Sequence, residues 1–253
     1  MTQSILSVNN QKLIKKLHQK KYRIQHKLYI AEGIKVVKDS LKYGAQPFFI
    51  TVCKELLKER LNFSSPVYLV DYHIMKNISG LESPEGLLAV FRIPESYFIT
   101  TTELDEKILV LNEINDPGNA GTLIRSAHWF GFNTVIFTEN TVDPYNFKVV
   151  QAAKGSLPAI KIIQASSIDL IEIFKKQCTT VYMAHVAGES CYNLNWNQKN
   201  EKTALVLGNE SHGLNKAWLN SGFRLLNIPS RSVSSPDSLN VAVAGSILMS
   251  YIA

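Results

Sequence analysis

A polar stretch at residues 112–125 carries the side chains of this chain that are best suited to chemistry. Arg125 supplies a planar guanidinium that stays charged and fits phosphate oxygens. Asn119 offers an amide that both donates and accepts hydrogen bonds. Gly118 and Gly121 lack side chains, so the backbone between these residues can approach a ligand closely. An ordinary connecting loop would contain similar turn residues, so this stretch alone leaves both interpretations open.

Two further polar turns follow apolar segments nearer the C-terminus. The first is Gly208-Asn209-Glu210, which comes after the apolar residues 204–207. The second follows Ile228 and Pro229 through a serine-rich loop and includes Ser238 and Asn240. Ligand-binding groups of α/β proteins lie at the carboxyl ends of parallel strands. We therefore expect the three polar turns to converge at one site.

The three segments together resemble the three motifs of the SpoU/TrmH family of RNA ribose 2′-O-methyltransferases, which belong to the SPOUT class. Residues 112–125 carry Asn-x-x-x-Asp-Pro-x-Asn-x-Gly-x-x-x-Arg, residues 207–214 carry Leu-Gly-Asn-Glu-x-x-Gly-Leu, and residues 228–241 carry Ile-Pro followed by Ser-Leu-Asn-Val. The resemblance covers about residues 105–253 and is weaker in the N-terminal part. It implies S-adenosylmethionine-dependent 2′-O-methylation of a ribose in structured RNA, either rRNA or tRNA.

The same resemblance assigns the cofactor to backbone groups of the second and third motifs. The residues concerned are Leu207, Gly208, Asn209, Ile228 and Leu239. A glycine at 208 would let the backbone close on an adenosine, although a turn that ends a strand also favours glycine.

The resemblance also implies five catalytic-site residues: Arg125, Asn119, Glu210, Ser238 and Asn240. Because a guanidinium is scarcely ever deprotonated in proteins, we expect Arg125 to hold phosphate and stabilise a developing alkoxide rather than act as a base. Glu210 is expected to hold Arg125 or Asn119 in position. Four of these residues also have an ordinary alternative: a surface ion pair for Arg125, a solvent-facing side chain for Glu210, and helix N-caps for Asn119 and Ser238.

The third motif departs from the family pattern. Ser230 stands where methionine is usual, no glycine precedes Ser238, and the loop is about two residues longer. These departures support an alternative, a non-catalytic RNA-binding protein that retains the methyltransferase fold. A nucleotide-dependent oxidoreductase is a third hypothesis, but the expected glycine-rich fingerprint is missing after the first strand.

Alternating apolar and amphipathic segments predict an α/β protein with a mostly parallel sheet in the C-terminal part. Strands are predicted near 107–112, 134–138, 159–164, 180–186, 203–208 and 224–228, and helices near 119–130, 145–153, 167–177, 213–221 and 238–252. The resemblance adds a deep trefoil knot, which periodicity cannot reveal. The predicted division is an N-terminal domain at 1–95, a linker at 96–106 and a methyltransferase domain at 107–253.

The N-terminal residues predict a smaller α/β domain that resembles the L30e-like substrate-binding domain of many SpoU/TrmH enzymes. Helices are expected over 7–22, from Gly33 onward, near 54–61 and near 72–78, with strands near 29–33, 48–52, 67–70 and 87–91. The resemblance is carried by Tyr22-Arg23, Glu32-Gly33 and Ser83-Pro-Glu-Gly86. Direct RNA contact and a role in turns and helix starts are both open for these residues.

Positive charge is concentrated near the N-terminus. The chain carries a formal net charge of +6, and between residues 12 and 42 ten Lys and Arg face only two acids. This imbalance indicates a polyanionic partner such as nucleic acid, although a solvated helix face is the common explanation of a lysine run. The predicted RNA-binding residues are Lys15, Lys16, Lys20, Lys21 and Arg23.

Composition excludes several other classes of protein. No apolar run is long enough to span a bilayer, and the first residues lack a charged lead-in followed by an apolar core. The three cysteines show no metal-like spacing, so reduced cysteines in a cytoplasmic protein without metal are expected. By resemblance, a homodimer formed through the C-terminal domain is also expected.

Overall fold

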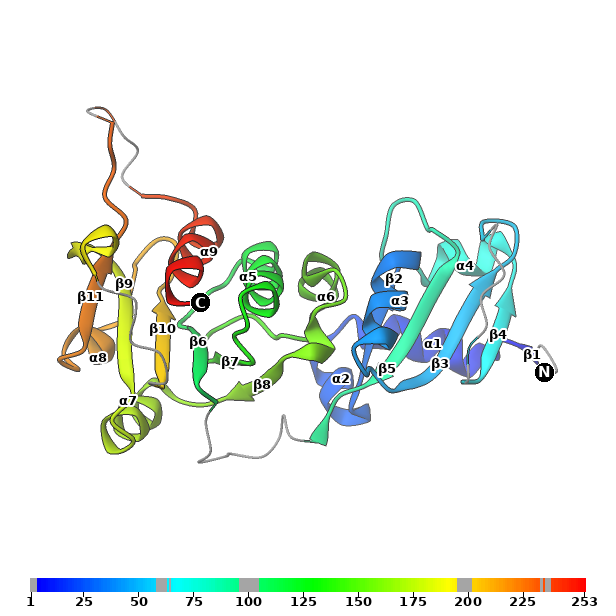
Figure 1. Cartoon of the computed structure of the whole chain (residues 1–253). Coiled ribbons are helices and arrows are strands. Elements are labelled where there is room, and N and C mark those ends of the chain that lie inside the picture. The colour runs from blue at the N-terminus through cyan, green and yellow to red at the C-terminus, as the bar shows by residue number, and fades with distance from the viewer. Residues whose placement is uncertain are drawn as a thin grey trace. The chain divides into compact units, whose positions relative to one another are not determined.

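The computed structural model describes residues 4–57, 63, 65–95, 105–194, 202–232, 234 and 238–253. The chain forms two compact units, drawn in Figure 1. The first contains Met1–Pro94 and Asp143–Ala159, and the second contains Glu95–Val142 and Ile160–Ala253. None of the helices in the described part of the chain is long and apolar enough to cross a membrane.

The second unit is built on a six-stranded sheet in the order β11-β9-β10-β6-β7-β8, with every neighbouring pair parallel. The strands are β6 Lys107–Leu111, β7 Thr134–Phe137, β8 Lys161–Gln164, β9 Thr180–Ser190, β10 Thr203–Leu207 and β11 Arg224–Asn227. The helices are α5 Pro117–Trp129, α7 Ser167–Lys176, α8 Lys216–Leu219 and α9 Val241–Ile252. The predicted parallel α/β architecture is confirmed.

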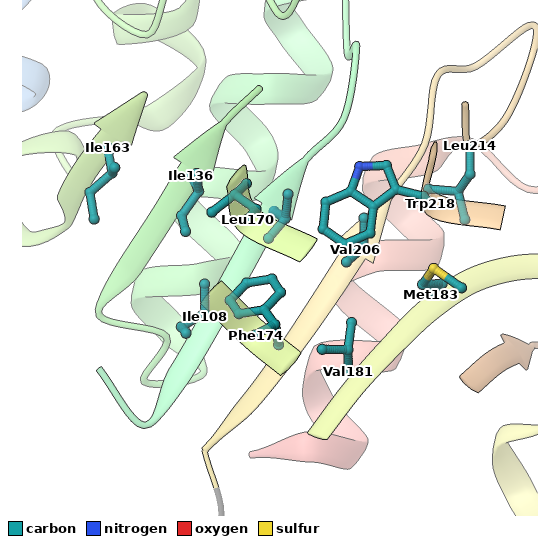
Figure 2. Packing of buried hydrophobic residues seen from close by; sticks show 12 residues of the cluster. Ile108, Ile136, Ile163, Leu170, Phe174, Val181, Met183, Val206, Leu214 and Trp218 are labelled. Atoms are coloured by element: carbon teal, nitrogen blue, oxygen red, sulfur yellow. The ribbon is translucent and has the colours of Figure 1, made fainter. Parts of the chain in front are cut away.

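Helices cover both faces of this sheet. On one face, sheet residues such as Ile108 and Val206 pack against Phe174 of α7 and Trp218 of α8 (Figure 2). Because strand side chains alternate between faces, Leu207 points to the opposite face. There a Cβ added to Gly245 of α9 would lie 2.5 Å from Leu207 Cδ1. The central strands β6, β7 and β10 are buried on both sides, which explains why they read as continuous apolar runs.

The chain returns from the edge of this sheet to its middle. Strand β11 is the outermost strand, yet the helix that follows it, α9, packs against α5 and β10. Consecutive elements are usually neighbours, so this return is unusual and agrees with the topology that the resemblance implies. The trefoil knot itself stays a prediction.

The first unit contains a mixed five-stranded sheet in the order β1-β4-β3-β5-β2. Its strands are β1 Ser4–Ile5, β2 Leu28–Glu32, β3 Pro47–Cys53, β4 Val67–Val70 and β5 Leu87–Arg92. Its helices are α1 Val8–Leu17, α2 Lys20–His26, α3 Ile34–Lys42, α4 Tyr72–Ile78 and α6 Phe147–Ala153. The smaller α/β domain expected from the sequence is therefore present, together with a short first strand that was not predicted.

Two predicted helices of this unit need correction. The helix expected over 7–22 is two helices, because Gln19 adopts an extended backbone conformation between α1 and α2. In the helix expected near 54–61, residues 54–56 form a turn, and residues 58–61 lie outside the described residues. Apolar spacing continues across the Gln19 break, so periodicity alone could not detect it.

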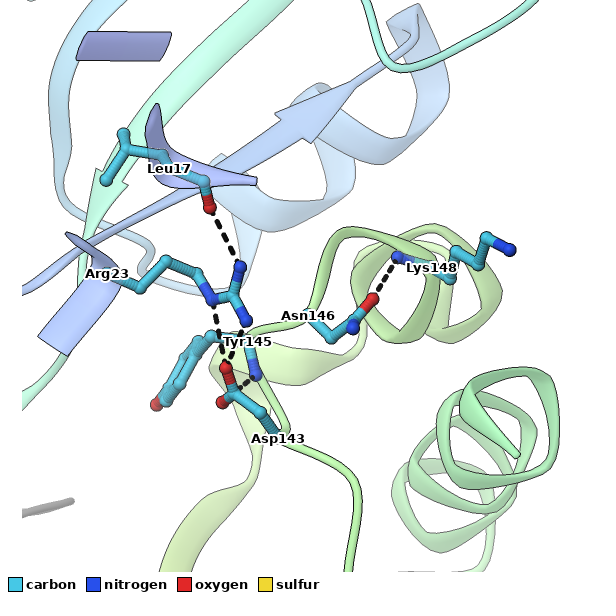
Figure 3. A network of polar contacts seen from close by, with 6 residues as sticks. All are labelled: Leu17, Arg23, Asp143, Tyr145, Asn146 and Lys148. Atoms are coloured by element: carbon cyan, nitrogen blue, oxygen red, sulfur yellow. Dashed lines mark hydrogen bonds and ion pairs between the residues drawn. The ribbon is translucent and has the colours of Figure 1, made fainter. Parts of the chain in front are cut away.

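Helix α6 belongs to the first unit although it lies far along the chain. It packs against β2, and Gln151 donates a hydrogen bond to the Glu32 carbonyl at 3.0 Å. Just before α6, Asp143 accepts two hydrogen bonds from the buried Arg23 guanidinium, at 2.9 and 2.5 Å (Figure 3). Residues 143–159 were expected in the domain at 107–253, but they belong to the first unit. Most of the expected linker, residues 96–104, lies outside the described residues.

The motifs of the N-terminal domain contact one another. Glu32 is fully buried and accepts hydrogen bonds from Ser79 Oγ at 2.5 Å and from the Gly80 N–H at 2.9 Å. Glu85 accepts from the Ile34 N–H at 3.0 Å, so it caps α3, whose N-cap residue Gly33 has no side chain. The two carboxylates hold the loop at 79–86 against the start of α3, which is the structural alternative considered for these motifs.

Candidate active site

The turn after β6 starts helix α5 through Asp116 and Pro117. The Asp116 carboxylate accepts from the Asn119 N–H at 2.7 Å, and Pro117 occupies the first helical turn. Both are favoured at a helix start, because proline has no N–H to leave unbonded. The alternative in which Asn119 is the N-cap is therefore wrong. The Asn119 side chain is available for hydrogen bonds to other residues.

Three side chains from the three motifs form one hydrogen-bonded chain. Asn240 Nδ2 donates to Asn119 Oδ1 at 3.0 Å, and Asn119 Nδ2 donates to Glu210 Oε1 at 3.0 Å. The residues are 121 and 91 positions apart in sequence, so only the fold brings them together. The expected convergence of the three polar turns is thus observed, and Glu210 contacts Asn119 as expected.

Helix α9 begins at Val241 and is capped by Asn240, not by Ser238. The Asn240 Oδ1 accepts from the N–H groups of Ala242 and Val243, while its amide nitrogen reaches Asn119. One side chain therefore caps α9 and joins it to the start of α5. Ser238 and Leu239 are exposed, and the alternative of Ser238 as N-cap is wrong.

The second motif forms a closed turn next to these residues. The backbones of Asn209 and Gly213 exchange two hydrogen bonds of 2.9 Å. A Cβ on Gly208 would lie 2.5 Å from the Gly213 carbonyl carbon, so the turn itself requires glycine there. The Asn209 side chain accepts from the N–H groups of Ser211 and His212 and donates to the Glu113 carbonyl at 2.8 Å. Glu210 is thereby carried on a rigid turn.

Two peptide groups at this edge of the sheet are open to a ligand, such as the adenosine-containing cofactor that the sequence predicts. The half-buried peptide groups of Gly208 and Ile228, which follow β10 and β11, form no hydrogen bonds within the described residues. Buried or half-buried peptide groups are normally bonded, so these are available to a ligand. The Leu207 carbonyl, in contrast, already accepts from the Asn112 N–H at 2.8 Å. Of the expected cofactor-binding residues, Gly208 and Ile228 therefore have the clearest structural support.

Arg125 lies on the same helix as Asn119 but does not join the hydrogen-bonded chain. Six helical residues separate them, a rise of roughly 9 Å. The Arg125 side chain is exposed, and it has no hydrogen bond or ion pair within the described ranges. Its alternative role in a surface ion pair is thus not observed there, and its guanidinium is open to an anion from solution.

The predicted RNA-binding residues fall into two groups. Lys15, Lys16, Lys20 and Lys21 are exposed on α1 and α2, and the Lys16 and Lys21 ammonium groups lie 5.3 and 4.8 Å from the centre of the Tyr22 ring. Arg23 is buried and bound to Asp143 and the Leu17 carbonyl. Its prediction as an RNA contact is wrong, because its guanidinium is used inside the first unit.

Sequence reasoning missed the polar residues beneath the motif turns. Asn112 is fully buried at the end of β6 and donates to Thr138 Oγ1 and Ser167 Oγ at 3.1 and 3.3 Å. Asn215 caps α8 and donates to Glu113 Oε1 at 3.0 Å. The Asn112-Glu113 pair directly after a buried strand was the available signal. No group of three or more potential metal-binding side chains occurs in the described part of the chain.

Comparison with known proteins extends these observations to the whole chain. Residues 106–250 match the model of the SpoU rRNA Methylase family, and residues 9–89 match that of the MRM3-like substrate binding domain. A Bacillus subtilis relative, the 23S rRNA (guanosine(2553)-2′-O)-methyltransferase RlmP, is 29% identical over 98% of both chains. The mouse mitochondrial rRNA methyltransferase 3 is 27% identical over 87% of this chain and 66% of its own length.

Solved structures agree with this match. A putative RNA methyltransferase of the TrmH family from Porphyromonas gingivalis is 30% identical, with a TM-score of 0.86 over 98% of both chains. The AdoMet-bound rRNA methyltransferase from Sinorhizobium meliloti is 27% identical, with a TM-score of 0.81 over 99% of this chain and 97% of that one. The three motifs meet at one edge of the parallel sheet, and the family model spans that sheet and its helices. The chain belongs to the SpoU rRNA methylase family.

Proposed function

We propose that this protein transfers a methyl group from S-adenosylmethionine to the 2′-hydroxyl of a ribose in rRNA. The observation that carries this proposal is the chain Asn240–Asn119–Glu210, which joins the three motifs of the family at one place. Family membership and the rRNA methyltransferase activity named for the RlmP and mitochondrial relatives support it.

S-adenosylmethionine supplies an electrophilic methyl, so the protein must mainly bind, orient and stabilise charge. The unbonded peptide groups of Gly208 and Ile228 would hold the adenosine. Arg125, exposed and without a partner in the described residues, would bind the phosphate beside the target ribose and stabilise the alkoxide. The N-termini of α5 and α9, joined through Asn119 and Asn240, add a positive potential that favours these anionic groups.

Methyl transfer to RNA tests this proposal directly. The protein is incubated with labelled S-adenosylmethionine and ribosomal RNA that lacks its natural methylations, and labelled positions are mapped by alkaline cleavage. A label at a position that resists cleavage is expected, because a methylated 2′-oxygen cannot attack the adjacent phosphate. Binding of the cofactor and the RNA without any label would favour the non-catalytic alternative, which the altered third motif with Ser230 supports.

The exposed lysines of α1 and α2 are proposed to dock the RNA by phosphate contacts. The match of residues 9–89 to a substrate-binding domain supports this role. Lys16 and Lys21 lie on Tyr22, so this surface combines positive charge with an aromatic ring.

A homodimer through the C-terminal domain is proposed on the basis of its exposed apolar side chains. Trp129 on α5 is 84% exposed, and Val243 and Tyr251 on α9 are also exposed. Helices α5 and α9 pack together, and both carry catalytic-site residues at their starts. Sedimentation velocity at micromolar concentration should give about twice 28.4 kDa. A single species at 28.4 kDa would contradict the dimer.

A further inference from the structure

Glu113, the residue two positions after β6, has an unusual backbone conformation. Its φ is +58°, in the left-handed region that non-glycine residues other than Asn and Asp rarely adopt. This conformation is strained for a residue with a side chain, and it persists only when its surroundings impose it. The contacts of Glu113 show what imposes it.

The N–H, the carbonyl and the carboxylate of Glu113 all form hydrogen bonds, and their partners lie far from Glu113 in the sequence. Its N–H donates to Thr138 and Thr141 at 3.3 and 3.0 Å. Its carbonyl accepts from Asn209 Nδ2 at 2.8 Å, and its carboxylate accepts from Asn215 Nδ2 at 3.0 Å. The left-handed conformation is thus tied to the loop after β7, the second motif and the start of α8.

The hydrogen bonds that Glu113 accepts from Asn209 and Asn215 lie at the two ends of the second motif. Asn209 begins the closed turn that carries Glu210, and Asn215 caps α8 just after the turn ends. Gly208, whose peptide group is proposed to contact the cofactor, directly precedes Asn209. Glu113 therefore holds both ends of the loop that shapes the cofactor side of the site, although it contacts neither Asn119 nor Glu210 by any hydrogen bond within the described residues.

We propose that Glu113 is a positioning residue that fixes the second-motif loop in its cofactor-binding conformation. Its carbonyl and carboxylate anchor the two ends of the loop, and its left-handed backbone is what directs them there. This inference rests on the proposed function, since it assigns the loop to S-adenosylmethionine. It predicts that cofactor affinity and folding stability respond differently to substitutions at residue 113.

Three substitutions separate positioning from general stabilisation. Glu113→Gly removes the carboxylate but adopts positive φ without strain, so its melting temperature should equal or exceed that of the wild type. Glu113→Ala removes the same carboxylate and keeps the strain, so its melting temperature should be lower than that of Glu113→Gly. Glu113→Gln retains an oxygen that can accept from Asn215, so it should behave like the wild type.

The Kd of S-adenosylmethionine, measured by isothermal titration calorimetry, is the decisive readout. We expect it to rise roughly tenfold in both Glu113→Gly and Glu113→Ala, because both lose the same hydrogen bond to the loop. In Glu113→Gln it should stay within about twofold. KM for the cofactor should follow the Kd, while kcat at saturating cofactor should change by less than about threefold.

Each outcome has a defined meaning. A Kd that rises only in proportion to a fall in melting temperature would overturn the inference, and so would an unchanged Kd in the glycine and alanine variants. A wild-type protein that does not bind S-adenosylmethionine would instead overturn the proposed function and this inference with it. If the glycine variant does not fold, then the strain argument is wrong, and the glutamine and alanine pair still tests the carboxylate.

Discussion

For single residues, the site combines a fixed chain of hydrogen-bonded side chains with the exposed guanidinium of Arg125. Asn119 is held from both sides by Asn240 and Glu210, whereas Arg125 is exposed and lacks a partner in the described residues. A side chain that is already bonded can orient its neighbours without rearrangement, which favours preorganised catalysis. An exposed guanidinium is better suited to an anionic substrate. The two kinds of residue should therefore respond differently to substitution.

The first prediction concerns Arg125→Ala. Methyl transfer should fall by roughly a hundredfold or more, because the alkoxide and phosphate lose their charged partner. The Kd of S-adenosylmethionine, measured by equilibrium dialysis, should stay within about twofold of wild type. Arg125→Lys is the matched control, and it should retain intermediate activity because it keeps the charge but not the planar fork. Equal losses of cofactor binding and transfer in Arg125→Ala would show that the assigned role is wrong.

The second prediction concerns the pH dependence of folding at Glu32. Burial raises the pKa of the Glu32 carboxyl, and hydrogen bonds from Ser79 and Gly80 oppose this only in part. The folded state therefore binds the proton more tightly than the unfolded state, so its stabilising contribution is present at low pH and is lost as pH rises through the raised pKa.

Urea denaturation at several pH values between 4.5 and 7.5 measures this effect. The free energy of unfolding of the wild type should fall relative to that of Glu32→Gln as pH rises, since glutamine does not titrate. Glu82→Gln, which changes an exposed carboxylate of the same loop, should show no such trend against the wild type. A difference between wild type and Glu32→Gln that is constant with pH, or that grows in favour of the wild type, would contradict the prediction.

At the scale of elements, the α1–α2 corner separates exposed lysines from one internal arginine. Gln19 interrupts the helix, and the new helix α2 turns Arg23 toward Asp143 while Lys20 and Lys21 remain exposed. Lys21 and Arg23 are only two residues apart in the sequence, yet Lys21 is exposed and Arg23 is buried. Net charge alone predicted the same role for both.

The third prediction follows from these exposed lysines. Lys15→Glu together with Lys16→Glu should weaken RNA binding and lower the slope of log K against log salt by about 1 to 2, because each phosphate contact contributes roughly 0.7–0.9. Lys175→Glu with Lys176→Glu is the matched control, since it places the same charge change on exposed residues of α7. Filter binding at several salt concentrations measures both. An equal effect of the two pairs would show that overall charge, not this surface, determines the affinity.

At the scale of the whole molecule, the first unit is completed by residues from late in the chain. Asp143, Tyr145 and Gln151 contact Arg23, Tyr29 and Glu32 respectively. A chain cut near residue 95 would lack α6 and leave the Arg23 guanidinium buried without its carboxylate. An unpaired buried charge is strongly destabilising, so the N-terminal domain is not expected to be stable when expressed as residues 1–95.

The fourth prediction tests this ion pair with a double-mutant cycle. Arg23→Met and Asp143→Leu should each lower the free energy of unfolding by about 3 to 5 kcal/mol, because each leaves one buried charge unpaired. The double variant should lose less than either single variant. Chemical denaturation measures the cycle, and the salt slope for RNA should be unchanged in Arg23→Met. Additive losses would mean that the pair does not act as a unit.

Local sequence identified most of the elements of the protein. Apolar runs such as 107–111 and 203–207 are buried on both faces, which makes them recognisable without a partner strand. The Asp116-Pro117 pair marks the start of α5 by chemistry that is purely local, although Asn119 was considered as its N-cap. The break at Gln19 escaped detection because helical spacing continues across it.

The three motifs, the parallel sheet and the set of residues that could do chemistry were predictable without a structure, because residue type and periodicity are local properties. Three features came only from the folded chain: Asn240 joins α9 to Asn119, Arg23 is internal, and residues 143–159 pack with the first unit. Each of these features depends on a contact between residues that are 119 to 121 positions apart, and local residue patterns cannot specify such a contact. The role of a side chain depends on the group that it contacts in the folded protein, and the position of a residue in the sequence does not show which group that is.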